Sequence, residues 1–351
     1  MRRPERQRAL PPQVLCLGEA LLDRLGPPGA DPASAAPHQC TDHLGGAPAN
    51  VACALARLGT PAAFLGRLGR DAIGAAFAQL LNERGVDRRA LQWDGQRPSR
   101  IVLVRRDVSG ERQFGGFAAA ESGCAAAAFA DQALDAARLS AALGPLLAQA
   151  RWLLVGTIPL ASPAAASALQ LACRQAAAAG VALALDVNWR PTFWDAAADP
   201  ASGPDPLAIA AMRPLLEQAA LLKCAREEAE WLFGSVDAAA VSAALPQRPA
   251  VVVSDGGAPL SWCSGALSGS LPAFPVTVID STGAGDAFTA GLLHRLCAEP
   301  QLLTAQQAEA ASMVAALRFA AACGALVCQG AGAIDPQPDP ALVQAFLSAA
   351  V

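Results

Sequence analysis

Residues 280–288 read DSTGAGDAF, and this stretch decides the fold more than any other part of the chain. The β-branched residues Val276, Val278 and Ile279 precede it and predict a strand that runs into a glycine turn. After the turn, apolar residues recur at helical spacing, at positions 288, 292, 293 and 296. The stretch therefore predicts a helix N-terminus, where unpaired backbone N–H groups and the helix dipole together hold an anion.

The residue types in this turn point to a reaction rather than to binding alone. Gly283 and Gly285 let the backbone approach an anion closely, because no Cβ stands in the way. Asp286 places a carboxylate beside that anion, where it would repel a phosphate that is merely held. A base that removes a proton, next to backbone that stabilises a transferring phosphoryl group, explains the carboxylate. Helix capping by Asp286, with glycines that serve only the turn, remains the alternative.

Composition narrows the classes of protein that fit. The chain has 351 residues, 53% hydrophobic and 16% charged, with a net charge of −4, which is enough to bury a large α/β core. No basic stripe is present, so we expect no nucleic-acid partner. The 10 cysteines and 3 histidines form no cluster, so we expect no zinc site. No apolar signal or membrane span follows the basic residues 1–8, which predicts a cytoplasmic protein with no membrane partner.

Two common phosphate-binding motifs are missing. Lys223 is the only lysine and follows Leu222, whereas a P-loop needs Gly-Lys-Ser/Thr. The turn at 283–288 lacks the third glycine of a dinucleotide fingerprint, since Phe288 occupies that position. Any phosphate chemistry would then rely on backbone N–H groups, arginine and a metal ion.

The order of elements predicts an α/β fold. From residue 152 strands and helices alternate, which predicts a mostly parallel central sheet with helices on both faces. Residues 1–12 predict a disordered leader, and residues 13–345 predict one domain. Two extended segments, at about 19–41 and 97–118, fit the helical layering poorly, and we interpret them as a small β-sheet lid. The lid would cover the carboxyl ends of the central strands, where ligands bind in such sheets.

Polar residues follow several of the predicted strands. Asp23 suits a pair of sugar hydroxyls, although a lone aspartate in a loop is often merely solvated. Gly45 and Gly46 lead into a helix in which Asn50 would either bond a hydroxylated ligand or cap the helix. Residues 186–190 alternate a carboxylate, an amide and a guanidinium on one side, for a ligand or for an internal salt bridge.

With these residues in hand, the chain resembles the PfkB-type carbohydrate kinases of the ribokinase-like superfamily, and fructokinases most closely. The resemblance covers about residues 13–337. The N-terminal family signature is matched by GGAPANVA at 45–52, and the C-terminal signature by DSTGAGDAF at 280–288. Two long motifs in the right order make the match specific.

The resemblance implies a ribokinase-like fold and ATP-dependent phosphorylation of a sugar, with fructose 6-phosphate from fructose as the first expectation. Asp286 would be the base, and the N–H groups of Gly283, Ala284 and Gly285 would form the anion hole. Sugar contacts would come from Asp23, Gly45, Gly46 and Asn50. ATP and phosphate contacts would come from Asn188, Arg190, Glu228, Ser254, Gly257, Ala321 and Gly324. Glu228 would hold Mg²⁺ through water, and Asp280 and Thr282 match positions that bind a monovalent cation such as K⁺ in some relatives.

The chain departs from the family pattern at two positions, and the resemblance leaves alternative functions open. Ala225 replaces the asparagine of the family's Asn-x-x-Glu motif, and Val252 replaces a threonine that usually lies under ATP. 2-Keto-3-deoxygluconate kinases and ribokinases share the signatures, whereas nucleoside kinases fit the GGAPAN form less well. A catalytically idle scaffold of kinase fold is the alternative from another class. Relatives often dimerise through the β lid, which implies a homodimer.

Overall fold

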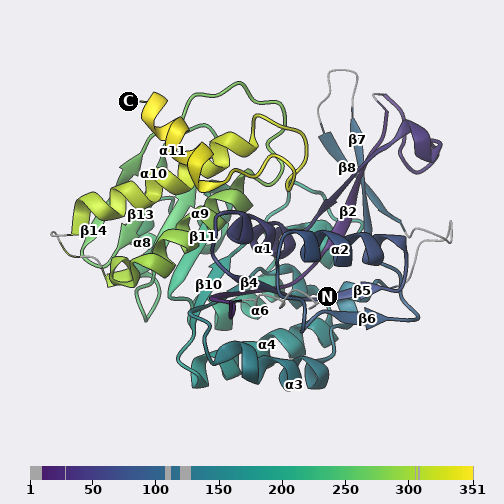
Figure 1. Cartoon of the computed structure of the whole chain (residues 1–351), viewed down its shortest axis with the longest axis horizontal. Helices are drawn as coiled ribbons and strands as arrows, with labels where there is room; N and C mark the ends of the chain where they lie inside the picture. Colours follow the sequence, from purple (N-terminus) through teal and green to yellow (C-terminus); the bar gives the residue numbers. More distant parts are fainter. Residues whose placement is uncertain are drawn as a thin grey trace, which may run out of the picture.

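The computed structural model describes residues 10–27, 29–106, 112–118, 128–304, 306 and 309–350. Within these residues eight strands form a central sheet in the order β14-β13-β12-β11-β10-β9-β1-β4 (Figure 1). The strands from β4 to β12 are parallel, and only the β12-β13-β14 pairs are antiparallel. Their bounds are Val14–Leu17 (β1), Ala62–Leu65 (β4), Trp152–Val155 (β9), Ala182–Asp186 (β10), Leu221–Ala225 (β11), Ala250–Ser254 (β12), Leu260–Ser264 (β13) and Leu267–Leu271 (β14). The mostly parallel sheet predicted from the sequence is confirmed.

Helices cover both faces of this sheet, because its strands are apolar on both sides. In β1, Val14 and Cys16 pack into one buried cluster, and Leu15 and Leu17 pack into a second cluster on the opposite face. The first face carries α1 (Ala47–Arg57), α2 (Ala72–Glu83), α9 (Ala284–Ala298), α10 (Ala310–Val327) and α11 (Pro340–Ala349). The second carries α3 (Ala136–Leu147), α4 (Pro163–Ala178), α6 (Pro206–Leu216), α7 (Arg226–Phe233) and α8 (Ala238–Ala243). Figure 1 shows α10 and α11 far from α3 and α4.

Helices α1 and α9 begin differently from several other helices. Helices α2, α3, α6, α8 and α11 each follow an aspartate whose carboxylate accepts hydrogen bonds from the first backbone N–H groups. Helices α1 and α9 instead follow Gly46 and Gly283, which have no side chain to cap them. The first N–H groups of these two helices are therefore open to other acceptors.

A separate four-stranded sheet has the order β3-β2-β7-β8 and is called the lid sheet below. Its strands are Leu21–Leu25 (β2), Thr41–Gly45 (β3), Ile101–Arg106 (β7) and Arg112–Ala118 (β8). Figure 1 shows it standing beside the central sheet, at the upper right. The predicted segments 19–41 and 97–118 contain three of these strands. The fourth, β3, begins where the first segment was expected to end, and it runs directly into α1.

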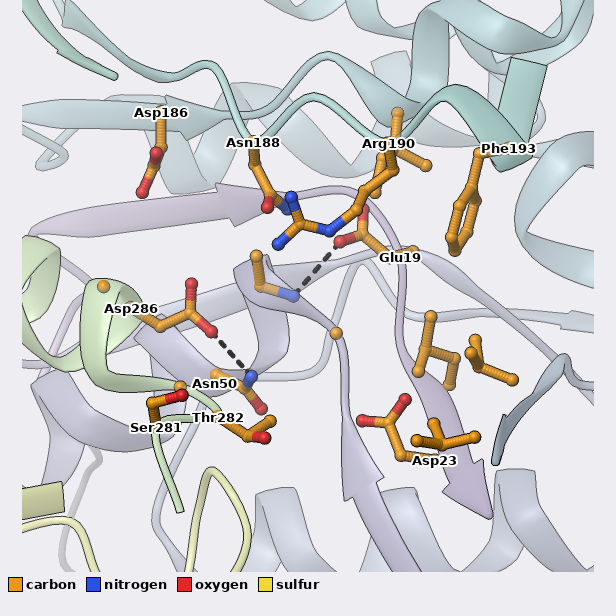
Figure 2. A pocket seen from close by; sticks show the side chains of 18 of the residues that line it. Glu19, Asp23, Asn50, Asp186, Asn188, Arg190, Phe193, Ser281, Thr282 and Asp286 are labelled. Atoms are coloured by element: carbon orange, nitrogen blue, oxygen red, sulfur yellow. Dashed lines mark hydrogen bonds between the residues drawn. The ribbon is translucent and has the colours of Figure 1, made fainter. Parts of the chain in front are cut away.

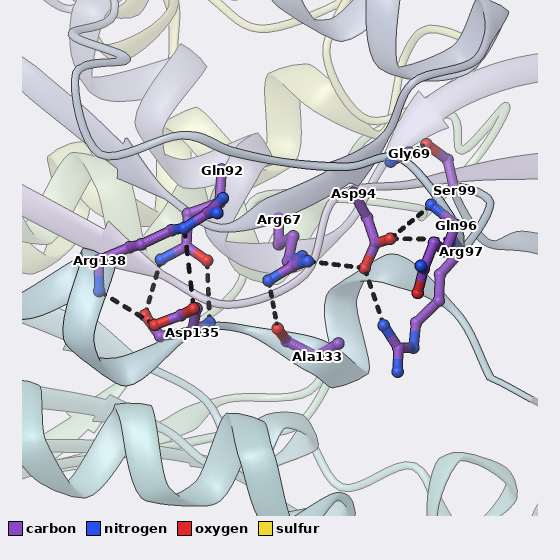
Figure 3. Close-up of polar contacts among 10 residues, drawn as sticks. All are labelled: Arg67, Gly69, Gln92, Asp94, Gln96, Arg97, Ser99, Ala133, Asp135 and Arg138. Atoms are coloured by element: carbon purple, nitrogen blue, oxygen red, sulfur yellow. Dashed lines mark hydrogen bonds and ion pairs between the residues drawn. The ribbon is translucent and has the colours of Figure 1, made fainter.

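A buried polar network fastens a two-stranded sheet, β5 (Arg67–Gly69) and β6 (Gln92–Asp94), to the start of α3 (Figure 3). The Arg67 guanidinium bonds the Asp94 carboxylate at 2.9 Å and the Ala133 carbonyl at 2.9 Å. The Gln92 amide exchanges two hydrogen bonds with the backbone of Asp135. Asp94 is 2% exposed, so the arginine and backbone donors supply the partners that a buried carboxylate requires.

Arg100 ties the lid sheet to the body of the protein. It is 3% exposed and pairs with Asp131 at 3.0 Å. Its guanidinium lies 4.7 Å from the ring centroid of Phe117 in β8, 4.4 Å from that of Phe129 and 4.7 Å from that of Phe193. Three aromatic faces around one cation give a desolvated cation–π cluster where the lid sheet meets the body.

Three sequence predictions need comment. The strand expected at 276–279 is wrong: the segment is irregular, and Val278 and Ile279 are 60% and 67% exposed. Residues 1–9 of the expected leader lie outside the described residues, as do residues 107–111 and 119–127. Helix α10 is long and apolar enough to cross a membrane, but half of it is buried in the fold, as in the core helix of a globular protein.

Candidate active site

A cavity of about 570 Å³ lies between the lid sheet and the carboxyl ends of the central strands. Asp186, Ala225 and Ser254, the last residues of β10, β11 and β12, line it. One face of the lid sheet closes it from the other side through alternate residues, namely Leu21, Asp23, Leu25, Val102, Val104 and Phe114. The volume suits a small-molecule site, and its position is the one expected for a parallel α/β sheet.

Asp286 and Asn50 meet in this cavity from two different helices. The Asn50 amide donates to Asp286 Oδ2 at 2.7 Å, and Figure 2 shows the two side chains pointing toward one another. Asn50 lies inside α1, four positions after Gly46, so the helix-cap role left open for it is wrong. Asp286 makes no capping bond in α9 either. Both polar side chains face the cavity, as a site for a hydroxylated ligand requires.

The surroundings of Asp286 tune its carboxyl group toward proton transfer. Burial raises its pKa from 3.8 to about 6, against the lowering effect of the hydrogen bond from Asn50. The Asp186 carboxylate raises the pKa further, and the charges of Lys223 and Arg190 lower it. A carboxyl group with a pKa near 6 is ionised at neutral pH and is a better base than a solvated aspartate.

The turn before α9 leaves backbone donors open beside Asp286. Gly283 has φ 79°, and a Cβ there would lie 2.5 Å from the Cβ of Ala333, so only glycine fits. The Ala284 N–H is used within the turn, on the Ser281 carbonyl at 3.2 Å. The N–H groups of Gly283 and Gly285 have no acceptor among the described residues, and both glycines line the cavity. These two N–H groups, more than that of Ala284, are therefore available to an anion in the cavity.

Sequence reasoning missed Lys223, which reaches this cavity from β11. Its Nζ pairs with both oxygens of Asp186, at 3.0 and 2.9 Å, and a Cβ on Gly285 would lie 3.3 Å from it. Burial lowers the pKa of Lys223, but the Asp186 carboxylate outweighs this and the net shift is upward, so the lysine is charged. Thr289 of α9 donates to Asp186 at 2.9 Å and completes the set. The cavity therefore offers a phosphate an ammonium group, which the expectation of backbone N–H groups, arginine and a metal ion did not include.

The predicted trio at 186–190 does face the cavity, but the expected salt bridge within it is replaced by the Asp186–Lys223 pair. Asn188 has φ 44°, a left-handed conformation that asparagine tolerates better than most residues. Arg190 donates to the carbonyl of its neighbour Trp189 at 2.8 Å. Figure 2 shows its side chain between those of Asn188 and Glu19.

Glu228 also lines the cavity, but both its oxygens accept backbone hydrogen bonds, from Trp189 at 2.6 Å and from Ala225 at 2.7 Å. It thus holds the 186–190 segment against the start of α7. Burial raises its pKa, and the hydrogen bond from Ala225 opposes the rise.

On the lid side, Asp23 presents its carboxylate to the cavity, and Gly45 leaves room for it. A Cβ on Gly45 would lie 2.7 Å from Asp23 Oδ2. Gly46 lines the cavity directly, whereas Gly45 does not. Of the four expected sugar contacts, Asp23, Gly46 and Asn50 therefore line the cavity, whereas Gly45 only leaves room for the Asp23 carboxylate.

The residues expected to contact ATP or phosphate do not all reach the cavity. Ser254 lines the cavity, but Gly257, Ala321 and Gly324 do not, and Gly324 packs α10 against the Ala284 carbonyl of α9. Val252 is buried in the core, so the missing threonine hydroxyl has no cavity to face. Asp280 accepts from the N–H groups of Thr282 and Gly332 and is 5% exposed.

A family model described as "pfkB family carbohydrate kinase" matches residues 11–340. This match and the ribokinase-like fold identify the class of the protein as carbohydrate kinase, and the chain belongs to the pfkB family. Among curated proteins, fructokinase-1 of Oryza sativa subsp. japonica is 31% identical over 93% of this chain and 94% of its own length.

Solved structures agree with this family. A fructokinase from Xylella fastidiosa with bound ATP has a TM-score of 0.78 and 28% identity, over 96% of this chain and 98% of that one. A fructokinase from Vibrio cholerae O395 in a form with fructose, ADP and calcium ion has a TM-score of 0.72 and 28% identity, over 96% of this chain and 99% of that one.

Proposed function

We propose that the protein transfers the γ-phosphoryl group of ATP to the primary hydroxyl of fructose, giving fructose 6-phosphate. The observation that carries the proposal is the pairing of a base with an anion pocket. Asp286, with a pKa raised to about 6, lies one residue from the open N–H group of Gly285. The names of the relatives support fructose as the sugar, since the three similar proteins reported above are fructokinases.

In this reaction Asp286 takes the proton of the sugar's primary hydroxyl. The hydroxyl oxygen then bonds to the γ-phosphorus of ATP while the bond between the γ-phosphorus and ADP breaks. Asn50 fixes the Asp286 carboxylate through the 2.7 Å hydrogen bond, so the base needs no reorientation. The N–H groups of Gly283 and Gly285 and the Lys223 ammonium would offset charge on the transferring group. Asp23, Gly46 and Asn50 would hold the other sugar hydroxyls. The lid sheet would exclude water that otherwise hydrolyses ATP.

The residues around the phosphate end fit a Mg²⁺ ion held mainly by phosphates and water. The Asp186 carboxylate pairs with Lys223, and both oxygens of Glu228 accept hydrogen bonds from backbone N–H groups, so both carboxylates already have partners. Mg²⁺ keeps several waters and neutralises phosphate charge when it binds with ATP. Glu228 would reach the ion through water. We also propose Asp280 and the Thr282 carbonyl for K⁺, and Gly257, Ala321 and Gly324 for the adenosine part.

One feature of the cavity favours a second substrate. The exposed Arg190 guanidinium lines it and would pair with a substrate carboxylate, which 2-keto-3-deoxygluconate has and fructose lacks. Ribose, the third candidate, is supported only by the shared family signatures.

A coupled assay of ADP release with Mg²⁺, with and without K⁺, tests these sugars. We expect the highest kcat/KM with fructose. The variant Arg190→Ala should lower kcat/KM for ketodeoxygluconate more than it lowers kcat/KM for fructose. A higher kcat/KM for ketodeoxygluconate or ribose would overturn fructose. Absence of turnover with every sugar would favour an idle scaffold. We further propose a cytoplasmic homodimer joined through the lid sheet, which sedimentation analysis tests.

A further inference from the structure

Glu19 is a buried acid in the cavity wall that the proposed reaction does not use. It follows β1 in the three-residue link to β2, so it lies where the central sheet passes into the lid sheet. Its side chain lines the cavity and the residue is only 3% exposed. Oε1 accepts the Ala47 N–H at 3.1 Å, whereas Oε2 has no hydrogen-bond partner among the described residues. Figure 2 places the carboxyl group between the start of α1 and Arg190.

An orphaned buried oxygen in a ligand cavity calls for a ligand group. Leaving such an atom unpaired is unfavourable, and more so if it is charged, so native proteins rarely do so without a reason. Ala47, which Glu19 bonds, and Asn50, which bonds Asp286, are three residues apart in α1, about 4.5 Å along the helix. The two acids are thus anchored about one helical turn apart on α1, they line the same cavity, and the charge of Asp286 acts on Glu19, so one ligand in the cavity would lie beside both.

We propose that Glu19 is a specificity-determining residue that hydrogen-bonds, through Oε2, a sugar hydroxyl other than the one phosphorylated. This inference rests on the proposed function, since it assigns a contact to the same sugar. Glu19 differs from Asp23 and Asp286 in chemistry, because it would donate the hydrogen bond rather than accept it. Oε1 is already an acceptor for Ala47, so a proton on the group belongs on Oε2.

The charges that face Glu19 explain why it would keep that proton. Burial raises its pKa to about 8, its own and the Ala47 backbone N–H groups lower it, and the carboxylates of Asp131 and Asp286 raise it. Arg100, a buried cation that lines the same small cavity as Glu19, is committed to Asp131 through two hydrogen bonds. Arg190 faces the cavity from the segment after β10. At neutral pH Glu19 is therefore mostly a neutral acid.

A structural role for Glu19 is the competing explanation. Glu19 also borders a second, small cavity of about 10 Å³, lined by Arg100, Asp131 and Ile158 among others. One water there would satisfy Oε2, and Glu19 would then only fix the start of α1. If Glu19 had only this structural role, its substitution would change KM by the same factor for every sugar, whichever hydroxyl the sugar lacks.

The test compares Glu19→Ala and Glu19→Gln with wild type, and exposed Glu217→Ala as control, on fructose and its monodeoxy analogues at C1, C3 and C4. We expect Glu19→Ala to raise KM for fructose about tenfold or more with a smaller change in kcat. With the wild-type protein, the analogue that lacks the hydroxyl bound by Glu19 should have a KM higher than that of fructose by about the same factor. With Glu19→Ala, the KM values of that analogue and of fructose should be nearly equal. Glutamine keeps an acceptor for Ala47 and a donor for the sugar, so Glu19→Gln should recover most of the lost affinity.

The pH profile gives a readout that a structural role would not move. Wild-type KM for fructose should rise above pH 8, as Glu19 ionises and loses its donor, whereas KM of Glu19→Gln should stay flat there. Equal losses for all analogues, or the same alkaline rise in both proteins, would overturn the inference while leaving the kinase assignment intact. Should Glu19→Ala fold poorly by circular dichroism, Glu19→Gln and wild type still decide the matter. Failure of every protein to turn over any sugar would instead refute the proposed function.

Discussion

Replacing Asp286 by asparagine should make the protein less active and more stable at the same time. Asparagine has nearly the same shape, and its carbonyl oxygen would still accept the hydrogen bond from Asn50, so the cavity keeps its form. What disappears is the base and its buried charge. The two effects have opposite signs, which is expected of a group held in an unfavourable environment for function.

The structure gives a magnitude for each effect. Loss of a general base typically costs about 10²-fold or more in turnover. Burial shifts the Asp286 pKa from 3.8 to about 6, roughly two units, and each unit corresponds to about 1.4 kcal/mol. Because the folded-state pKa lies above the unfolded one, the folded state binds the proton more tightly and loses stability as pH rises through 6. The variant should therefore gain up to about 3 kcal/mol at pH 7 and nothing below pH 4.

Two measurements on the same protein check this. Turnover of the preferred sugar is followed by ADP release at pH 7.5, and the free energy of unfolding by urea titration at pH 4 and pH 7. Glu227→Gln, an exposed acid at the start of α7, is the matched control and should change neither quantity by much. Turnover within a few-fold of wild type would refute Asp286 as the base. A variant that is less stable at pH 7 than wild type would refute the electrostatic argument.

Further predictions address the neighbours of Asp286. Asn50→Ala removes a bond that lowers the Asp286 pKa, so the acid limb of the kcat/KM profile should move from about pH 6 to about pH 7; an unmoved limb would contradict the assignment. Lys223→Met leaves the buried Asp186 carboxylate without its cation and should lower the free energy of unfolding by about 3–5 kcal/mol in urea; an unchanged midpoint would show that the pair contributes little. Gly285→Ala puts a Cβ 3.3 Å from Lys223 Nζ, and should cut kcat at least tenfold with a normal melting temperature.

The central residues of the candidate site were predictable from the sequence because they belong to local motifs. The turn at Gly283, the base Asp286 and the amide Asn50 each sit at a helix start with recognisable glycines, and the structure brings all three to one cavity. The residues 186, 188 and 190 also face it, because Val187 and Trp189 point into the core.

Other parts of the site were beyond a local pattern. Lys223 lies in an apolar run and gives one weak signal, an isolated charge within a central strand. Its partner Asp186 is 37 positions away and is recognised only from the sheet order. Glu19 depends likewise on how β1 passes into the lid sheet. The strand expected at 276–279 failed because β-branched composition indicates an extended chain but supplies no partner strand.

The hydrogen bond between Asn50 and Asp286 joins residues 236 positions apart, and Gln337 reaches back 287 positions to the Asn50 carbonyl. On the ribosome the amino-terminal half of the site is thus made long before its partner exists. Until α9 arrives, the face of α1 that carries Val51 and Leu55 has no cover from it. For most of its synthesis a nascent chain of this protein therefore has an incomplete site, and it exposes apolar surface that the finished fold buries.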